Sequence, residues 1–263
     1  MRRLTDQTGR TVVIPSDLKR IVSLVPSQTE LLHYLGAGDA VVGITKFCIH
    51  PNEWFRTKTR VGGTKNVSMQ TIRSLNPDLI IANKEENVKE QIESLSEHYP
   101  VWTSDINTLD DACDMIMSVG QILGKEMLAE SMTQTIVNEF KALPKASPPL
   151  RTAYLIWNDP YMTVGHDTFI HDMLTRCGLE NVFAAETRYP AITIEQLQAA
   201  NCELLLLSSE PYPFKQKHVD ELRRHLPHTR ILLADGEMFS WYGSRLLHAL
   251  AYFKSLISSN FTA

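Results

Sequence analysis

Two stretches of this chain, 125 residues apart, follow the same local plan, and this repeat limits the fold more than any other feature. Residues 72–81 and 197–206 each carry a short helical pattern, a turn at an asparagine and an acidic residue that opens an apolar run. A polar loop, a second helical pattern and a second strand-like run follow each stretch. Because these elements recur in the same order, the sequence predicts two similar α/β lobes.

Strand-like and helical segments alternate along both halves, which is typical of α/β proteins with mainly parallel sheets. The helix predicted over residues 29–36 has Ser27 as its N-cap, Glu30 completing a capping box and Gly36 as its stop. Further helices are predicted over residues 169–177 and 244–256. Strands are predicted over residues 20–25, 41–44, 78–82, 101–102, 153–157, 204–207 and 231–233.

One helical pattern between the two halves is more regular than the rest. Its apolar face consists of Leu128, Met132, Ile136, Phe140 and Leu143. A helix of about 18 residues is about 27 Å long, enough to join two small lobes while resisting bending, so we expect little lobe motion. The predicted domains are an N-terminal α/β lobe over residues 1–106, a helical segment with the connecting helix over residues 107–150, and a C-terminal α/β lobe over residues 151–263.

Composition and charge exclude several classes of protein. With 43% hydrophobic residues and a net charge of −4, the chain is too apolar for a disordered protein, and its pI of about 6.1 argues against nucleic-acid binding. No apolar run approaches the ~18 residues of a membrane helix. The first residues lack the apolar segment of a signal peptide, so we expect a cytoplasmic protein or one whose leader was removed. The four cysteines form no CxxC pair, and most are expected to be buried.

Two lobes leave a cleft, and ligands of parallel α/β sheets gather where loops follow the carboxyl ends of strands. The loops that this rule selects hold three of the four tryptophans. Aromatic faces with a few fixed polar groups suit a large planar ligand such as a macrocycle, and capping of the core is the alternative for each ring. The predicted ligand contacts are Pro26, Ser27, Phe47, Trp54, Thr64, Lys65, Lys84, Glu85, Trp157, Tyr161, Arg188, Tyr189, Tyr212, Trp241 and Tyr242.

Sequence signatures of enzymes are mostly missing. The chain has no Gly-x-Ser-x-Gly elbow, Walker-type loop, His-Glu-x-x-His or Gly-x-Gly-x-x-Gly motif, so we predict a binding protein without an intrinsic cofactor. Cys48 and His50 are weak candidates for metal ligands, with Glu85 or Glu86 as further donors, and a packed turn is the favoured alternative. Action of Cys48 and His50 as nucleophile and base has little support.

Several motifs together resemble a known family. They are IVSLVPSQTE at residues 21–30, LG at 35–36, VVGIT at 41–45, VGG at 61–63, LNPDLI at 75–80, GLENVF at 178–183 and IEQL at 194–197. They are similar to the periplasmic binding proteins that serve ABC importers of vitamin B12, ferric siderophores and haem. The resemblance runs from about residue 4 to 256 and implies the class III fold, with two α/β lobes joined by one long, rigid helix. Residues 45–51 and 235–239 are similar to the cobalamin-binding members, which favours a corrinoid over a siderophore or haem.

The resemblance also implies a partner. Members of the family dock on the transporter permease through one surface carboxylate in each lobe. Glu195 matches this position in the second lobe, whereas the first-lobe counterpart is Gln70, an amide that cannot form the charged pair. Glu53 or Glu85 are alternatives for that role.

Members of the family generally act as monomers in the periplasm or cell envelope, which contrasts with the missing leader. The alternative hypothesis is a cytoplasmic metal- or cofactor-binding protein of the same fold, without a transporter.

Overall fold

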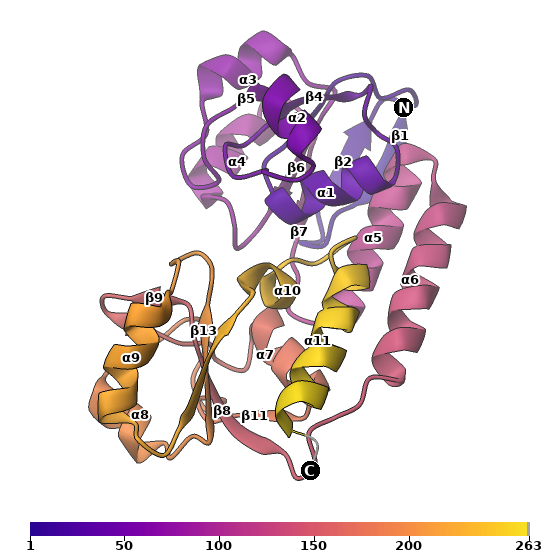
Figure 1. Cartoon of the computed structure of the whole chain (residues 1–263). Coiled ribbons are helices and arrows are strands. Elements are labelled where there is room, and N and C mark those ends of the chain that lie inside the picture. Colours follow the sequence, from indigo (N-terminus) through magenta and orange to yellow (C-terminus); the bar gives the residue numbers. More distant parts are fainter. Residues whose placement is uncertain (262–263) are drawn as a thin grey trace. The chain divides into compact units, whose positions relative to one another are not determined.

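The computed structural model describes residues 1–261 and divides into two compact units (Figure 1). Unit 1 comprises residues 1–106, 110–134 and 242–245. Unit 2 comprises residues 107–109 and 135–241, together with the chain from residue 246. Segment 242–245 therefore belongs to unit 1 although it is far in sequence from the rest of that unit.

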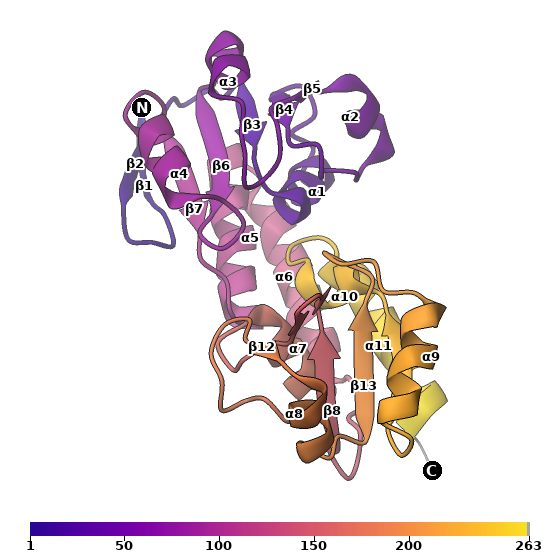
Figure 2. The ribbon, with the colours of Figure 1, turned by 90° about the vertical axis from the view of Figure 1, so that its left-hand side faces the viewer.

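Unit 1 is built around a five-stranded sheet in which every pair of neighbours is parallel (Figure 2). The order is β5 (Thr59–Arg60), β4 (Val41–Ile44), β3 (Ile21–Ser23), β6 (Leu79–Asn83) and β7 (Val101–Ser104). Every residue of β6 and β7 is buried, as expected for strands that are covered on both faces. Parallel pairing places all five carboxyl ends at one edge of the sheet.

Helices cover both faces of this sheet. α3 (Met69–Leu75) and α4 (Lys89–Ser96) supply Ile72, Ile92 and Leu95 to one core cluster. α1 (Pro26–Tyr34) lies on the opposite face, where Thr29 Oγ1 is 2.7 Å from Ser23 Oγ of β3. α2 (Asn52–Thr57), most of α5 (Leu109–Leu123) and the hairpin of β1 (Arg2–Thr5) and β2 (Thr11–Ile14) complete the unit.

Unit 2 repeats the plan with a parallel sheet in the order β11 (Leu179–Asn181), β8 (Leu150–Leu155), β13 (Leu204–Ser208) and β14 (Arg230–Ala234). α8 (Ile194–Ala199) and α9 (Gln216–His225) pack on one face through Leu197, Val219 and Leu222. Figure 1 shows α7 (Phe169–Arg176), α10 (Gly236–Ser240) and α11 (Leu246–Phe261) on the other face. A small antiparallel sheet contains β12 (Ala191–Ile192), β10 (Tyr161–Met162) and β9 (Trp157–Asn158). The predicted fold class, α/β with mainly parallel sheets, is confirmed.

The internal repeat extends to individual hydrogen bonds. Asn76 and Asn201, at the predicted turns, both adopt left-handed backbone conformations, with φ of 42° and 48°. The acidic residue that follows each turn binds the start of the neighbouring strand: Asp78 Oδ2 accepts from the backbone N–H of Arg20, and Glu203 Oε2 accepts from that of Arg151, both at 2.9 Å. An acidic side chain at the same position of the repeat therefore anchors the start of the neighbouring strand in each unit.

The two arginines of this repeat also serve the same purpose in each unit. Arg20 Nε donates to the Leu75 carbonyl oxygen and Arg151 Nη2 to that of Ala200, both at 2.6 Å. Each guanidinium thus satisfies a carbonyl at the end of a helix, where intrahelical partners are missing.

The regular helix between the halves is α6 (Glu126–Lys141), and the boundary between the units falls within it, after residue 134. Met132, Ile136 and Phe140 are buried as predicted, but Leu128 is 40% exposed. Ala129 is buried instead, because Gly120 of α5 allows a close approach: a Cβ on Gly120 would lie 2.4 Å from the Ala129 Cβ. The apolar face therefore begins one residue later than predicted.

The start of α1 differs from the prediction. The helix begins at Pro26, and Val25 is its N-cap without a side-chain cap. Ser27 is therefore inside the helix and buried, and Glu30 is not part of a capping box. Proline is favoured in the first turn because its missing N–H has no intrahelical acceptor there. Gly36, with φ of 76°, follows the helix as predicted.

Residues 1–261 contain no helix that is long and apolar enough to cross a membrane. Cys48, Cys177 and Cys202 are buried as free thiols, and Cys113 is half-buried. Their burial agrees with the expectation for isolated cysteines.

The contact between α5 and α6 gives a test of the packing in unit 1. Gly120→Leu should lower the free energy of unfolding by at least about 2 kcal/mol, because the added side chain has no space beside Ala129. Urea titration followed by circular dichroism measures the change.

Gly38→Ala is the matched control. A Cβ at Gly38 would be 3.6 Å from the Trp54 ring, an ordinary contact, so the change should stay within about 0.5 kcal/mol. Equal midpoints for Gly120→Leu and the unmodified protein would contradict the packing described.

Candidate functional site

The carboxyl edge of the unit 1 sheet collects loops from all five strands. The loops after β3, β4, β5 and β6 begin at residues 24, 45, 61 and 84, and residue 105 follows β7. Within unit 1, this edge brings together seven of the predicted contacts: Pro26, Ser27, Phe47, Thr64, Lys65, Lys84 and Glu85. Pro26, Ser27 and Thr64 are buried, and Phe47 is 50% exposed.

Two buried asparagines connect these loops. Asn83 Oδ1 accepts from the backbone N–H groups of Glu85 and Glu86 at 2.8 and 2.9 Å. Asn87 Nδ2 donates to the Thr64 carbonyl oxygen at 3.0 Å, and Asn87 Oδ1 accepts from the Asn83 N–H at 2.9 Å. The sequence predicts only a polar loop after residue 81, because polar composition does not reveal which amides turn inward. These bonds hold the loops after β5 and β6 in one arrangement, as a preformed site requires.

Apolar and basic side chains are exposed at this edge, beside the partly exposed carboxylates of Glu85, Glu86 and Asp105. The Lys46 ammonium is 5.0 Å from the Phe47 ring centroid. Ile49 is 43% exposed. Lys84 Nζ contacts Asp105 Oδ2 at 2.5 Å, and Lys65 donates to the Glu85 carbonyl oxygen at 2.5 Å. The edge thus offers apolar surface flanked by ammonium groups.

Cys48 lies under this edge and is not available to a ligand. Its thiol is fully buried, and Sγ is 3.1 Å from both Thr29 Oγ1 and Thr45 Oγ1. Burial raises the pKa of the Cys48 thiol, although the hydrogen bonds with the two threonines act against it. A thiol held protonated in this way is a poor nucleophile and a poor metal ligand. Among residues 1–261, no three His, Cys, Asp or Glu side chains are grouped to hold a metal ion.

Trp54 does not offer a face for stacking. It lies on α2, is 4% exposed, and packs edge-on against His33 at 5.1 Å between ring centroids. The Lys58 ammonium is 5.3 Å from the Trp54 ring centroid. Trp54 therefore caps the core of unit 1, the alternative considered for each aromatic residue, and the ligand contact predicted for it has no support in the structure.

The carboxyl edge of the unit 2 sheet carries an aromatic cluster. Trp157 of β9 and Tyr212 of the loop after β13 are 5.7 Å apart between ring centroids, and the Tyr212 hydroxyl is 3.1 Å from His218 Nε2. Trp157 is 40% exposed, and Tyr161 on the neighbouring β10 is half-buried. This cluster presents an exposed indole on a fixed support.

Arg188 and Tyr189 precede β12 of the same small sheet. The Arg188 guanidinium is 5.6 Å from the Tyr189 ring centroid, and its backbone N–H donates to Asp167 Oδ1 at 2.5 Å. Arg188 has φ of 54°, a left-handed conformation. The Arg188 side chain is exposed, so its charge is accessible.

Glu210, in the loop after β13, binds the end of α10 in unit 2. Its Oε1 accepts from Ser240 Oγ at 2.6 Å and from the Trp241 indole N–H at 2.8 Å. Burial raises the Glu210 pKa, and the nearby Glu237 and Asp235 carboxylates raise it further.

Trp241, in unit 2, and Tyr242, in unit 1, are both 6% exposed. The predicted stacking of these two rings on a ligand is thus not supported, because both are packed inside the protein.

Gln70 and Glu195 occupy equivalent positions in the repeat. Each is the second residue of a short helix, α3 capped by Ser68 and α8 capped by Thr193, and each is exposed. The Thr193 hydroxyl and the Glu195 N–H lower the pKa of the Glu195 carboxyl, which is consistent with a carboxylate at a helix start.

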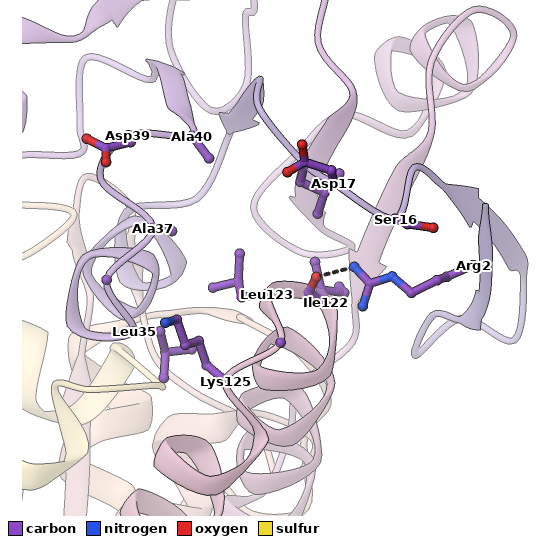
Figure 3. A pocket seen from close by; sticks show the side chains of 13 residues that line it. Arg2, Ser16, Asp17, Leu35, Ala37, Asp39, Ala40, Ile122, Leu123 and Lys125 are labelled. Atoms are coloured by element: carbon purple, nitrogen blue, oxygen red, sulfur yellow. Dashed lines mark hydrogen bonds between the residues drawn. The ribbon is translucent and has the colours of Figure 1, made fainter.

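A cavity of about 270 Å³ lies near the amino end of β4, away from these loops (Figure 3). Arg2 lines it and donates to the carbonyl oxygens of Gln121 and Ile122 at 2.8 and 2.5 Å, which stabilises the end of α5. Two acidic and two basic side chains line it, and its volume is below the ~300–1,000 Å³ of usual ligand pockets. The exposed rings and ammonium groups make the carboxyl edges the candidate site.

Comparisons with known proteins identify the family of this chain. The chain is 24% identical over 264 residues to an uncharacterized ABC transporter substrate-binding lipoprotein of Bacillus subtilis, covering 94% of this chain and 82% of the relative. It is 26% identical over 196 residues to the vitamin B12-binding protein of Vibrio parahaemolyticus, covering 73% and 71%.

Among solved structures, the periplasmic heme-binding protein RhuT of Roseiflexus has the same fold, with a TM-score of 0.79 and 24% identity over 94% of this chain and 100% of that chain. The model of the family described as periplasmic binding protein matches residues 21–229. That match covers most of the chain. It includes the carboxyl-edge loops of both units except the one that follows β14. The chain therefore belongs to the periplasmic binding protein family.

Proposed function

We propose that this protein is the substrate-binding component of an ABC importer and that it binds a metal chelate. The exposure of Phe47 and Trp157, each at the carboxyl edge of the parallel sheet of its own unit, is the observation that carries the proposal. Exposed rings on supported loops are unusual unless a ligand or partner covers them. Relatives named for vitamin B12 and haem support this ligand class.

The charges around the rings fit the edges of a macrocycle. Lys65 and Lys84 in unit 1 and Arg188 in unit 2 are exposed and can contact amide or carboxylate groups. Lys84 already pairs with Asp105, so a ligand carboxylate would have to compete with that ion pair. A corrinoid is the first candidate, because several relatives are named vitamin B12-binding proteins and residues 45–51 resemble the cobalamin-binding members.

A catalytic role through Cys48 is disfavoured by the same structure. The thiol is fully buried and protonated, and its two contacts are threonine hydroxyls rather than a base. The hypothesis of a cytoplasmic binding protein without a transporter is also disfavoured, because the Bacillus subtilis relative is an ABC transporter lipoprotein. We infer a location in the cell envelope, a monomeric state and a permease as the partner.

Ligand retention tests this function. The protein should retain cyanocobalamin, haem or a ferric hydroxamate at one-to-one stoichiometry after desalting, as its visible spectrum will show. Phe47→Ala and Trp157→Ala should each weaken binding of the retained chelate about tenfold or more, because each removes a stacking face.

Tyr34→Ala is the control for these two variants. Tyr34 is 42% exposed at the end of α1, away from the carboxyl edge, so its loss should leave the affinity unchanged. Retention of none of the three chelates would refute the proposed ligand class.

Docking on the permease gives a second test. Glu195→Gln should weaken binding to the reconstituted importer about tenfold, because charge-assisted hydrogen bonds to a permease arginine are lost. Gln70→Glu should strengthen it, because Gln70 occupies the equivalent exposed position in unit 1. Surface plasmon resonance measures both changes.

Glu126→Gln provides the matched control, since Glu126 is also an exposed carboxylate in the first turn of a helix. If Glu195→Gln binds the importer as well as the Glu126→Gln variant does, Glu195 is not a docking residue.

A further inference from the structure

A buried histidine, His218, contacts the aromatic cluster of unit 2. His218 is the third residue of α9 and is 4% exposed. Its Nδ1 accepts from the backbone N–H of Lys215 at 2.9 Å, and its Nε2 is 3.1 Å from the Tyr212 hydroxyl oxygen. Both ring nitrogens therefore have a partner. Turning the ring over would lose both bonds, because ring carbons would then face the two partners.

The bond with Lys215 decides where the ring hydrogen of His218 lies. A backbone N–H only donates, so Nδ1 is the acceptor and carries no hydrogen. An imidazolium has no acceptor nitrogen, so the ring is neutral and its hydrogen is on Nε2. The His218 Nε2–H consequently donates to the Tyr212 oxygen. The hydroxyl of Tyr212 thus accepts a directed hydrogen bond from a side chain that is itself held by the backbone.

Tyr212 connects His218 with the exposed indole of Trp157. The Trp157 and Tyr212 rings meet edge to face, with 5.7 Å between their centroids and an interplanar angle of 67°. Phe214 packs against Tyr212 as well, with 4.9 Å between ring centroids. The Trp157 indole N–H donates to the Asp159 carbonyl oxygen at 3.2 Å. The position of the Trp157 ring therefore depends on that of Tyr212.

We propose that His218 is a positioning residue of the ligand-binding edge of unit 2, and that its Nε2–H fixes the Tyr212 ring against which the Trp157 indole packs. This role rests on the proposed function for its ligand. A ring that is already held in place loses less conformational freedom when a ligand binds. Loss of the Nε2–H donor should therefore weaken binding, with His218 acting through Tyr212.

Two amide substitutions separate this role from a purely structural one. The amide of His218→Asn ends near the place of Nδ1, so it can accept from the Lys215 N–H but cannot reach Tyr212. The longer amide of His218→Gln ends near the place of Nε2 and can donate to the Tyr212 oxygen.

His218→Asn should lower the affinity for a chelate about fivefold, the effect of one hydrogen bond, whereas His218→Gln should stay within about twofold of the unmodified protein. The measurement is a titration followed by visible absorbance, with whichever of cyanocobalamin, haem or a ferric hydroxamate the unmodified protein retains. The opposite order would overturn the positioning role, because His218 would then serve only as an acceptor at the start of α9. Equal affinities in the two variants would also overturn it, since the Nε2–H donor would then have no effect of its own.

His228→Asn is the matched control. His228 is an exposed histidine in the turn before β14, at the opposite end of that strand from the carboxyl edge. The same change of side chain at His228 should leave the affinity unchanged.

The indole of Trp157 can also be observed in the ligand-free protein. Of the four tryptophans, Trp157 is 40% exposed and the other three are at most 6% exposed. In protein labelled with 5-fluorotryptophan, the ¹⁹F resonance of Trp157, assigned with Trp157→Phe, should shift in His218→Asn and return toward its original position in His218→Gln. An unshifted Trp157 resonance in His218→Asn would overturn the support of Trp157 through Tyr212.

Tyr212→Phe removes the acceptor and leaves His218 in place, and it carries the test if His218→Gln does not fold. It should weaken chelate binding about fivefold, and His218→Asn added to it should cause little further loss, because His218 acts through the Tyr212 oxygen. Additive losses would overturn that order of action. Retention of no chelate by the unmodified protein would refute the proposed function instead, and the ¹⁹F resonance would still decide whether His218 positions Trp157.

Discussion

Parallel pairing of strands is the constraint on which the rest of this structure depends. In each unit it sends all carboxyl ends of the main sheet to one edge, so loops from distant parts of the sequence converge there. Asp78 and Glu203 support this pairing by accepting a hydrogen bond from the start of a neighbouring strand. A candidate binding edge thus arises in both units, because the chain repeats the same helix, asparagine turn, acidic residue and strand 125 residues apart.

Buried polar side chains hold these loops in place through hydrogen bonds. Asn83 and Asn87 hold the loops of unit 1, and Glu210 holds the end of α10 in unit 2. Such networks are costly when incomplete, so their satisfied bonds favour a single loop arrangement. The exposed rings of Phe47 and Trp157 are consequently presented on supports that need little reordering when a ligand binds.

The sequence was sufficient for the fold but only partly for the site. Strand and helix patterns and the asparagine turns predicted the elements, and the rule of carboxyl edges predicted which loops lie at one edge of each sheet, because these depend on local chemistry and chain direction. Trp54, Trp241 and Tyr242 were predicted as ligand contacts but are buried, because a ring in a loop can turn inward and no periodicity reveals this. The link between Glu30 and Arg245 was also missed, since only the folded chain brings these residues together.

The most direct test of the central claim is a map of where a retained chelate protects the protein from amide exchange. With saturating cyanocobalamin, or whichever chelate is retained, protection should concentrate in residues 45–50 and 83–88 of unit 1 and residues 156–161 and 208–214 of unit 2. These segments are carboxyl-edge loops. Protection centred instead on the residues around Arg2 and the end of α5, which line the cavity in Figure 3, would contradict the account.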